Sequence, residues 1–493
     1  MKHAAPRAPT GVPGLDEILL GGLPRHRMYL VDGSPGVGKT TLALQFLMKG
    51  RELGEKCLYI TLSETRHELD AVAESHGWSL DGIEVIELSQ VQGSLGAKSR
   101  NTLFQPAEVE LSNLATLLLD ESARIQPDRL VLDSLSEMRL MAQNPLRYRR
   151  QILALKQHFA ERGCTVLLLD DRTAVGPDVQ VQSIVHGMIS LEVRPLKFGI
   201  NRRFLSVTKL RGSDFYEGHH DYVIRRGQLR VFPRLVADDH DTRLNKDLFS
   251  SGNAGLDRLA GGGFHGGTGN LLIGPAGSGK STVASMFAVS AAAAGNNVRF
   301  YAFDESTNIL IDRAREIGLD VDRQIASGRM RVQQIDAAEV APGELAAQIV
   351  HAAENEGVRM VVLDSLNGYV NAMPQEEFLH LHLHELLTYL NQRGVVTIMT
   401  LAQHGLIGQM GAPVDVSYLA DTVMLMRFFE AHGAIKKAVS VIKKRTGGHE
   451  TTIRELRMHT KGVTLTEPLV EFEGVMTGVP KYLGGELSKV NAH

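Results

Sequence analysis

The chain has 493 residues, of which 43% are apolar and 22% charged, with a formal net charge of -3. These values are typical of a soluble globular protein of roughly two to four domains, and they give no general argument for binding to nucleic acid or a membrane. Cys57 and Cys164 are its two cysteines, which excludes a disulfide framework, and we find no signal peptide and no run of about 18 apolar residues, so a cytoplasmic location is expected.

The first half of the chain alternates short apolar strands with helical segments. A helix is predicted over Thr40–Met48, and strands are predicted over Arg27–Asp32, Cys57–Leu62, Leu130–Leu132 and Thr165–Leu169. Strands that alternate with helices indicate a parallel sheet covered on both faces. The predicted fold class is therefore α/β.

A glycine-rich segment joins the first of these strands to its helix. Gly33-Ser34-Pro35-Gly36-Val37-Gly38-Lys39-Thr40 fits the phosphate-binding P-loop pattern completely. The glycines let the backbone aim its N–H groups at a phosphate chain, and the following helix adds its positive N-terminal end. Lys39 is predicted to reach the β- and γ-phosphates of ATP, and Thr40 to bind Mg²⁺. The other predicted nucleotide-binding residues are Gly33, Gly36, Gly38 and Thr41.

Two carboxylates follow later strands of the first half. Glu64 comes after the strand that ends at Leu62, where a carboxylate can polarise an attacking water near the γ-phosphate. The alternative is that it is a solvated loop acid or caps the next helix. Asp133 ends an apolar strand and is predicted to hold Mg²⁺, directly or through water.

A basic element, Lys209-Leu210-Arg211-Gly212, lies late in the first half. A Lys/Arg pair at the far edge of such a domain can reach a neighbouring subunit's γ-phosphate and offset the charge that develops there. A solvated basic turn is the alternative, and the spacing alone does not separate the two.

The second half repeats the first. Gly274-Pro275-Ala276-Gly277-Ser278-Gly279-Lys280-Ser281 is a second complete P-loop, and Glu64 matches Glu305 at the same spacing. A polar run from Ala237 to Asp247 precedes this copy, and the predicted domains are residues 1–241 and 242–493. Matching strands are predicted over Asn270–Ile273, Val298–Phe303, Met360–Leu363 and Val395–Met399.

The same correspondence assigns the predicted site residues of the second half. Lys280 is expected on the phosphates, and Ser281 and Asp364 on Mg²⁺. Asp304 and Glu305 are the expected catalytic carboxylates. The remaining candidates are the basic pair Lys443 and Arg445 and the nucleotide-binding residues Gly274, Gly277, Ser278, Gly279 and Thr282.

Two groups of histidines resemble metal sites at first sight. His380, His382 and His384 occupy every second position of a predicted helix, which spreads their side chains around its axis. The pair His219-His220 falls in a predicted loop. Surface histidines are the expectation in both places.

With these residues assembled, the chain resembles the KaiC family, a branch of the RecA-like ATPases. The likeness covers nearly the whole chain, and its specific marks are Thr10–Asp16, Ser75–Leu80 and Lys209–Gly212. It implies two tandem RecA-like P-loop domains, each a mostly parallel sheet with helices on both faces.

The resemblance also implies an activity and an assembly. KaiC proteins form two-tiered hexameric rings with ATP between neighbouring subunits; the first tier is a slow ATPase, and the second phosphorylates and dephosphorylates its own hydroxyl residues. By this analogy Ser75 lies beside the first-domain nucleotide, and Lys209, Arg211, Lys443 and Arg445 act across subunit interfaces. The implied cofactors are ATP and Mg²⁺, and the implied partners are other copies of the chain and KaiB-like or signalling proteins.

Three elements depart from the family pattern. The family's catalytic Glu-Glu pair is Ser63-Glu64 in the first half and Asp304-Glu305 in the second. Its adjacent Ser-Thr phosphosites correspond to Ser417-Tyr418, so Ser417 is the expected phosphate acceptor. Thr446 replaces the glycine after the second Lys-x-Arg. These differences favour a signalling or stress-response role over an oscillator with two neighbouring phosphosites.

Two other function classes remain as alternatives. A RecA-like DNA-handling motor is opposed by the negative net charge and by the lack of a zinc motif or an aromatic-basic platform for single strands. The basic cluster Arg147, Arg149 and Arg150 is explained equally well by an exposed helix face. A nucleotide-gated scaffold would use ATP to hold a ring together, and turnover per subunit distinguishes it from an ATPase with autokinase activity.

Overall fold

The computed structural model describes residues 6–87, 106–142, 144–172, 179–196, 199–236, 247–371, 376–403, 405, 416–431, 433–460, 462–477 and 480–483. The chain divides into two compact units, Met1–Arg234 and Leu235–His493, and each is described by itself. The predicted boundary between residues 241 and 242 lies outside the described residues.

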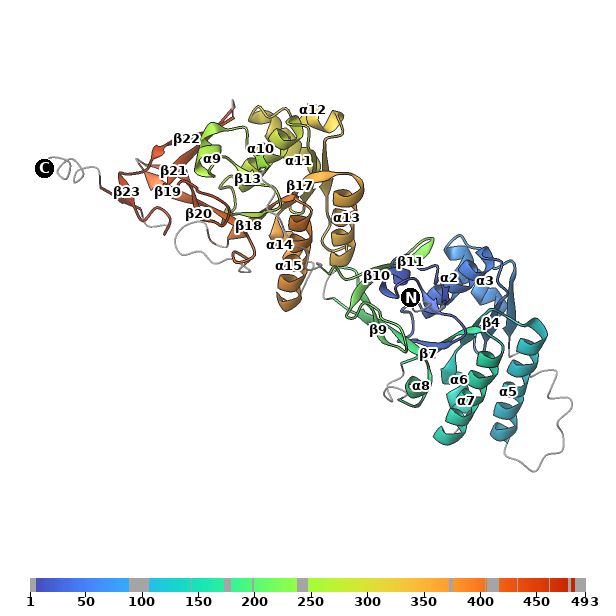
Figure 1. Ribbon diagram of the computed structural model, residues 1–493. Helices are drawn as coiled ribbons and strands as arrows, with labels where there is room; N and C mark the ends of the chain where they lie inside the picture. The colour runs from blue at the N-terminus through green and yellow to red at the C-terminus, as the bar shows by residue number, and fades with distance from the viewer. Residues whose placement is uncertain are drawn as a thin grey trace. The chain divides into compact units, whose positions relative to one another are not determined.

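A nine-stranded sheet forms the centre of the first unit, in the order β11-β10-β9-β8-β3-β7-β6-β4-β5 (Figure 1). The six strands from β8 to β5 are parallel, and β9, β10 and β11 extend the sheet as antiparallel strands. The strands are β3 (Met28–Gly33), β4 (Cys57–Thr61), β5 (Ile83–Glu87), β6 (Arg129–Asp133), β7 (Thr165–Asp171), β8 (Gly187–Arg194), β9 (Arg202–Leu210), β10 (His220–Arg225) and β11 (Gln228–Phe232). A separate two-stranded sheet pairs β1 (Arg7–Ala8) with β2 (Leu23–Pro24).

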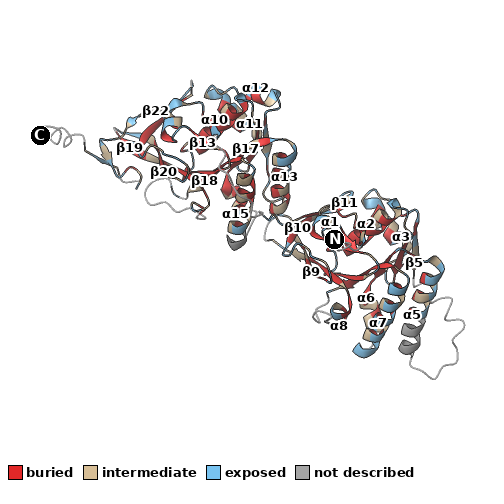
Figure 2. Cartoon of the chain, in the orientation of Figure 1, coloured by how far each residue is buried: buried red, intermediate tan, exposed pale blue. Residues whose placement is uncertain are grey.

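Helices cover both faces of this sheet. Figure 1 shows α2 and α3 on one face and α5, α6 and α7 on the other, and Figure 2 shows the buried strands between them. Alternate strand residues point to opposite faces: Tyr29 and Val31 of β3 pack in the core that contains α2, and Met28 and Leu30 in the core that contains α7. The helices are α1 (Leu15–Ile18), α2 (Lys39–Glu52), α3 (Arg66–Ser75), α5 (Pro106–Ile125), α6 (Leu135–Ala142), α7 (Pro145–Glu161) and α8 (Val179–Ile184).

The second unit repeats this architecture. Its nine-stranded sheet has the order β16-β15-β17-β18-β14-β19-β20-β21-β22, with β20, β21 and β22 antiparallel. The strands are β14 (Gly269–Pro275), β15 (Asn297–Ala302), β16 (Met330–Gln334), β17 (Val358–Asp364), β18 (Val396–Gln403), β19 (Thr422–Ala431), β20 (Ala434–Lys444), β21 (Arg454–His459) and β22 (Gly462–Pro468). The short strands β12 (Leu248–Phe249) and β13 (Phe264–His265) pair with each other, as do β23 (Phe472–Glu473) and β24 (Lys481–Tyr482). The helices are α9 (Ala254–Leu259), α10 (Lys280–Ala293), α11 (Thr307–Glu316), α12 (Val321–Ala326), α13 (Pro342–Asn355), α14 (Leu366–Asn371) and α15 (Glu376–Gln392).

The predicted α/β class and the two repeated sheets are confirmed, and each predicted strand overlaps an observed one, with ends that differ by at most four residues. The antiparallel extension of each sheet was not anticipated, because its strands are partly exposed and carry no continuous apolar run. Within the described ranges, no helix has both the length and the apolar character that crossing a membrane requires.

His220 corrects one expectation, since it begins β10 and is 0% exposed rather than lying at the surface. Its Nδ1 accepts a hydrogen bond from the backbone N–H of Arg234 at 2.7 Å, and its Nε2 lies 3.1 Å from the carbonyl oxygen of Tyr216. Burial lowers the pKa of His220 to about 4. A neutral imidazole satisfies both contacts, so the residue is structural.

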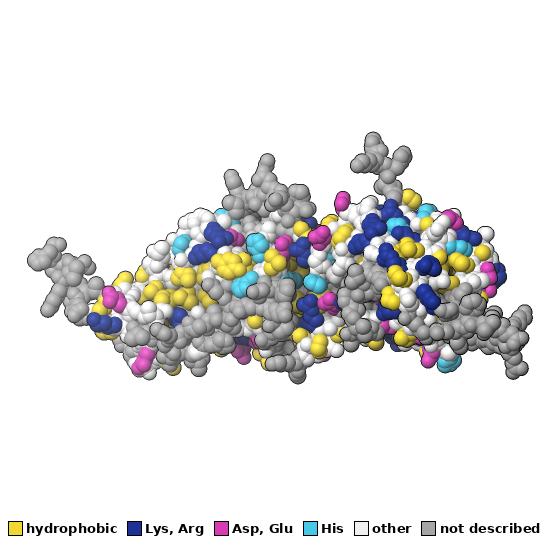
Figure 3. All heavy atoms as spheres, turned by 90° about the horizontal axis from the view of Figure 1, so that it is seen from below, with side chains coloured by type: hydrophobic (Ala, Val, Ile, Leu, Met, Phe, Trp, Pro, Cys, Tyr) yellow, Lys and Arg dark blue, Asp and Glu magenta, His cyan; other side chains and the backbone are white. Residues whose placement is uncertain are grey.

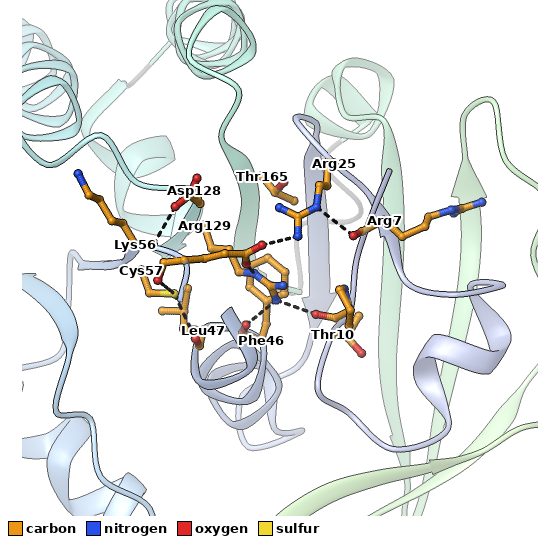
Figure 4. Close-up of polar contacts among 12 residues, drawn as sticks. Arg7, Thr10, Arg25, Phe46, Leu47, Lys56, Cys57, Asp128, Arg129 and Thr165 are labelled. Atoms are coloured by element: carbon orange, nitrogen blue, oxygen red, sulfur yellow. Dashed lines mark hydrogen bonds and ion pairs between the residues drawn. The ribbon is translucent and has the colours of Figure 1, made fainter. Parts of the chain in front are cut away.

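Arg129, the first residue of β6, is also buried, at 1% exposure. Its Nη1 donates to the carbonyl oxygens of Pro9 and Phe46, at 2.6 and 2.8 Å, and its Nε pairs with Glu55 (Figure 4). The guanidinium lies 4.6 Å from the centroid of the Phe46 ring. The strand register places Met360 at the matching position of the second unit, so this buried charge is particular to the first.

Candidate functional site

The first P-loop joins β3 to α2 at the carboxyl end of the parallel strands, where ligands bind in open α/β sheets. Gly36 and Gly38 have φ of 77° and 103°, which L-residues rarely adopt. A Cβ on Gly38 would lie 2.4 Å from Cδ1 of Ile224. The loop is therefore shaped by its glycines, and its backbone fits a phosphate chain.

Lys39 is held inside this loop. Its Nζ donates to the carbonyl oxygens of Gly33 and Ser34 at 2.9 and 3.0 Å, and it forms an ion pair with Asp171 at 2.7 Å. Asp171 ends β7, and it was not among the sequence-predicted residues because only the sheet brings it to the P-loop. Its counterpart by strand register is Ala402, so the second unit lacks this pair.

The second P-loop has the same geometry. Nζ of Lys280 donates to the carbonyl oxygens of Gly274 and Pro275 at 2.9 and 2.8 Å, and Gly277 and Gly279 have φ of 77° and 108°. Burial lowers the pKa of Lys280 to about 8, against the opposing charges of Asp364 and Asp304. An anionic ligand would favour the charged form of this lysine. Three further predicted residues are buried, and each lies two positions from Lys39 or Lys280 in the sequence: Thr41, Ser278 and Thr282.

The predicted magnesium ligands meet in both units. Thr40 Oγ1 lies 3.4 Å from Oδ2 of Asp133, which also accepts a hydrogen bond from the Tyr59 hydroxyl at 2.5 Å. In the second unit, Asp364 accepts from the Thr400 hydroxyl and interacts with Ser281. Burial raises the pKa of both aspartates. This set of oxygen donors beside a phosphate loop fits Mg²⁺.

Glu64 lies in the turn between β4 and α3. Its backbone N–H donates to Thr61 Oγ1, and Thr65 caps the helix in its place, so the capping role proposed as its alternative belongs to Thr65. Its Oε2 is buried and has no hydrogen-bond partner among the described residues. Burial raises the pKa of Glu64, and the charges of Asp133, Glu68 and Asp171 raise it further.

Asp304 and Glu305 occupy the matching turn of the second unit but have different partners. Asp304 accepts a hydrogen bond from the Ser365 hydroxyl, and its charge acts on Lys280. Both carboxylate oxygens of Glu305 accept hydrogen bonds from Arg313, at 2.6 and 2.8 Å.

Lys209 and Arg211 lie against α8 rather than against the P-loop of their own unit. Lys209 Nζ donates to the carbonyl oxygen of Gln182, and Arg211 to that of Ser183. Burial and the Arg211 and Lys156 charges lower the pKa of Lys209, so Lys156 of α7 belongs to the same cationic cluster. Figure 3 shows Lys and Arg side chains gathered on the first unit.

Lys443 and Arg445 make the corresponding contacts in the second unit. Lys443 Nζ donates to the carbonyl oxygen of Ser417 at 2.9 Å, and Arg445 to that of Tyr418 at 2.8 Å. Arg445 also lies 3.5 Å from Asp421. The structure thus brings the predicted basic pair to the predicted phosphosite.

Ser75, the last residue of α3, is exposed, and its hydroxyl donates to the carbonyl oxygen of Val72. The residues after it contact the turn between β10 and β11: His76 lies 3.1 Å from the Arg225 carbonyl oxygen, and Trp78 donates to that of Gly227. Ile224 of β10 is the side chain that a Cβ on Gly38 would meet, so the segment after Ser75 contacts a hairpin that packs against the P-loop.

Two of the histidines in α15 contact tyrosine side chains. His380 Nδ1 lies 3.1 Å from the Tyr418 hydroxyl, and the His382 ring lies beside that of Tyr369 in a tilted arrangement, with 6.0 Å between the ring centroids. Burial lowers the pKa of His382 to about 4. Among the residues the structure describes, no group of three or more His, Cys, Asp and Glu is arranged to hold a metal.

Comparison with known proteins gives the same division of the chain. The model of the family described as "ATPase: KaiC" matches residues 8–236 and again residues 249–470. The chain is 24% identical over 479 residues to the circadian clock protein KaiC3 of Synechocystis sp., covering 96% of this chain and 94% of the relative. It is 26% identical over 483 residues to the circadian clock oscillator protein KaiC of Thermostichus vulcanus, covering 96% and 92%. It is 25% identical over 487 residues to KaiC2 of Synechocystis sp., covering 96% and 84%.

The two family matches each span one folded unit and its P-loop, and together they cover most of the chain. The chain therefore belongs to the KaiC ATPase family.

Proposed function

We propose that both domains bind MgATP and that the first hydrolyses it with Glu64 as the general base. The observation that carries this proposal is the buried Oε2 of Glu64, which has no hydrogen-bond partner in the described part of the chain and lies within electrostatic range of Asp133 and Asp171. A base needs a free lone pair and a pKa closer to neutrality than that of an exposed carboxylate, and this environment supplies both.

The proposed reaction uses the chain's own residues as follows. Glu64 accepts a proton from a water molecule whose oxygen attacks the γ-phosphorus, while the bond to the β–γ bridging oxygen breaks and ADP leaves with its electron pair. Lys39 leaves its ion pair with Asp171 and binds the phosphates, and the N–H groups of the loop orient the phosphate chain. Mg²⁺, when bound by Thr40 and Asp133, would neutralise phosphate charge.

Steady-state hydrolysis of ATP by Glu64→Gln tests this role, in a full chain that also carries Glu305→Gln. We expect at least a tenfold loss with retained ATP binding, because general-base catalysis contributes about 10²–10⁴-fold. Ser63→Ala is the matched control and should keep its turnover. Unchanged hydrolysis in the Glu64 variant would show that Glu64 is not the general base.

We also propose that the second domain is a serine autokinase whose acceptor is Ser417. The support is the contact of Lys443 and Arg445 with the Ser417–Tyr418 turn, because the family resemblance places that Lys-x-Arg element near a neighbour's γ-phosphate. In the transfer, the Ser417 oxygen would bond to the γ-phosphorus, ADP would leave, and Asp304 would take the hydroxyl proton.

Incubation with radiolabelled ATP tests the autokinase. Wild type and Tyr418→Phe should take up label, whereas Ser417→Ala and Lys280→Ala should not. If label persists in Ser417→Ala but is lost in Lys280→Ala, the second domain is a kinase whose acceptor is a residue other than Ser417. If the wild type takes up no label, the autokinase proposal is wrong and only the ATPase proposal stands.

The assembly we propose is a cytoplasmic homohexamer with ATP between neighbours, regulated by KaiB-like or signalling partners. Its support is that Lys209, near the end of β9, and Arg211, just after it, contact α8 and not their own P-loop in the described contacts. The curated relatives are named as circadian clock proteins, and a regulatory role of that general kind is proposed for this chain.

A further inference from the structure

The two matched catalytic glutamates of this chain have different electrostatic partners. Glu305 is bound through both oxygens by the guanidinium of Arg313, at 2.6 and 2.8 Å. The pair is partly buried, with side-chain exposures of 20% for Glu305 and 33% for Arg313. Bidentate, charge-assisted pairs of this kind are geometrically specific and stronger than neutral hydrogen bonds.

The first domain offers a natural comparison. Thr65 and Ser306 cap the equivalent helices α3 and α11, and Val72 is the residue of α3 that corresponds to Arg313. A valine cannot bind a carboxylate, and Glu64 keeps an oxygen without a hydrogen-bond partner among the described residues. The two helices differ in most of their residues, but the Val72 and Arg313 position is the one that accounts directly for the bound state of Glu305 in the described contacts.

The arginine is also close to the reaction centre. Glu305 raises the pKa of Asp364, and Arg313 lowers it, so both side chains lie within electrostatic range of the predicted magnesium ligand. Arg313 takes one lone pair on each oxygen of Glu305 and fixes the carboxylate in place, so a water molecule can use it only through the remaining lone pairs and in the orientation that the pair dictates.

We propose that Arg313 is a positioning residue that withholds Glu305 from water, so that the second domain retains bound ATP while the first hydrolyses it. Asp304 is not bound by Arg313 in the described contacts and accepts its hydrogen bond from Ser365. In this proposal the clamp disfavours hydrolysis through Glu305 and leaves Asp304 available to a protein hydroxyl. The inference rests on the proposed function, because it assumes that both sites bind MgATP.

The test uses the full chain with Glu64→Gln, which leaves the second domain as the source of turnover. Adding Arg313→Val is expected to raise kcat for ATP hydrolysis about tenfold with KM unchanged, within the range that a general base contributes. Arg313→Lys should give an intermediate rate, because an ammonium cannot make the bidentate pair. Adding Glu305→Gln to Arg313→Val should abolish the gain, which a merely structural role for Arg313 would not do.

The reciprocal exchange is the second arm. Val72→Arg in a chain with Glu305→Gln is expected to lower first-domain turnover about tenfold, with thermal unfolding checking that the domain still folds. Unchanged or reduced turnover of Arg313→Val in the Glu64→Gln chain, while wild type hydrolyses ATP, overturns the clamp. Absence of hydrolysis in the wild type and in every variant overturns the proposed function itself, and the inference with it.

Discussion

Glu64 combines burial with a surplus of negative charge, and both act on its proton affinity. Its carboxylate is desolvated, and Asp133, Glu68 and Asp171 are the charges that act on it. All four effects raise its pKa. A general base works only when it is deprotonated, so hydrolysis should fall as the pH drops through this raised pKa.

The first prediction concerns this pH dependence. Removing the Glu68 charge should lower the pKa of Glu64, so the acid limb of the kcat profile of Glu68→Gln should move to lower pH than in wild type. Glutamine keeps the capping box that Glu68 forms with Thr65, so the helix is retained. The measurement is ATP hydrolysis from acidic to neutral pH in chains with Glu305→Gln. An acid limb that moves upward would contradict the assignment of Glu64.

The second prediction concerns the buried Arg129. Replacing it with alanine removes hydrogen bonds to two carbonyl oxygens and leaves Glu55 with Arg25 as its partner. We expect a loss of about 3–5 kcal/mol in the unfolding free energy of the first domain, seen as an earlier thermal transition. Arg66→Ala, which removes an exposed pair with Asp70, should cost less than about 1 kcal/mol. Equal losses of unfolding free energy in the two variants would show that burial does not determine how much each arginine contributes to stability.

At the scale of elements, the P-loop depends on how closely β3 approaches β8. A Cβ on Gly33 would lie 2.5 Å from the carbonyl oxygen of Leu191, and Gly274 has the same relation to Met426 at 2.4 Å. Backbone atoms cannot move aside as a flexible side chain would, so the first glycine of each motif is required by sheet packing as well as by phosphate binding.

The third prediction follows from this contact. Gly33→Ala should separate β3 from β8, destabilise the first domain by about 1–3 kcal/mol and abolish its ATP binding. Gly54→Ala is the control, because Gly54 also has a positive φ, 76°, but a Cβ there would meet nothing within 4 Å. It should keep ATP binding at a cost of about 1–2 kcal/mol. Thermal unfolding and nucleotide titration distinguish the two variants.

At the scale of the whole molecule, the basic pairs lie on the antiparallel extensions of the sheets. Lys209 is near the end of β9, and Lys443 near the end of β20. In the described contacts both bind carbonyl oxygens of the segment that precedes the neighbouring strand. In the assembly proposed above, side chains in this position complete a site on another copy of the chain.

The fourth prediction is therefore that MgATP drives assembly. Sizing chromatography should show a larger species with MgATP than without it, and Arg211→Ala combined with Arg445→Ala should weaken this shift, because a cation that offsets phosphate charge is lost. Arg226→Ala, an exposed arginine in the turn between β10 and β11, should behave like the wild type. A wild-type chain that stays monomeric in saturating MgATP would contradict the interface.

Sequence patterns alone determined much of this protein. The two P-loops, the strands that end in Asp133 and Asp364, and the repetition of both motifs predicted two α/β domains of one ATPase family, as the fold and the comparisons confirm. These features are local, because a glycine turn, or an apolar strand followed by an acidic residue, consists of consecutive residues.

Only the tertiary structure decided which side chains meet. Asp171 reaches Lys39 because β7 lies beside β3, and Arg129 is enclosed because α2 packs over β6. Arg313 and Glu305 are eight residues apart, yet their pairing depends on how the turn before α11 directs the glutamate toward the helix. Such contacts depend on distances between elements and on the rotamers that packing allows, and a linear pattern of residues does not specify either of these.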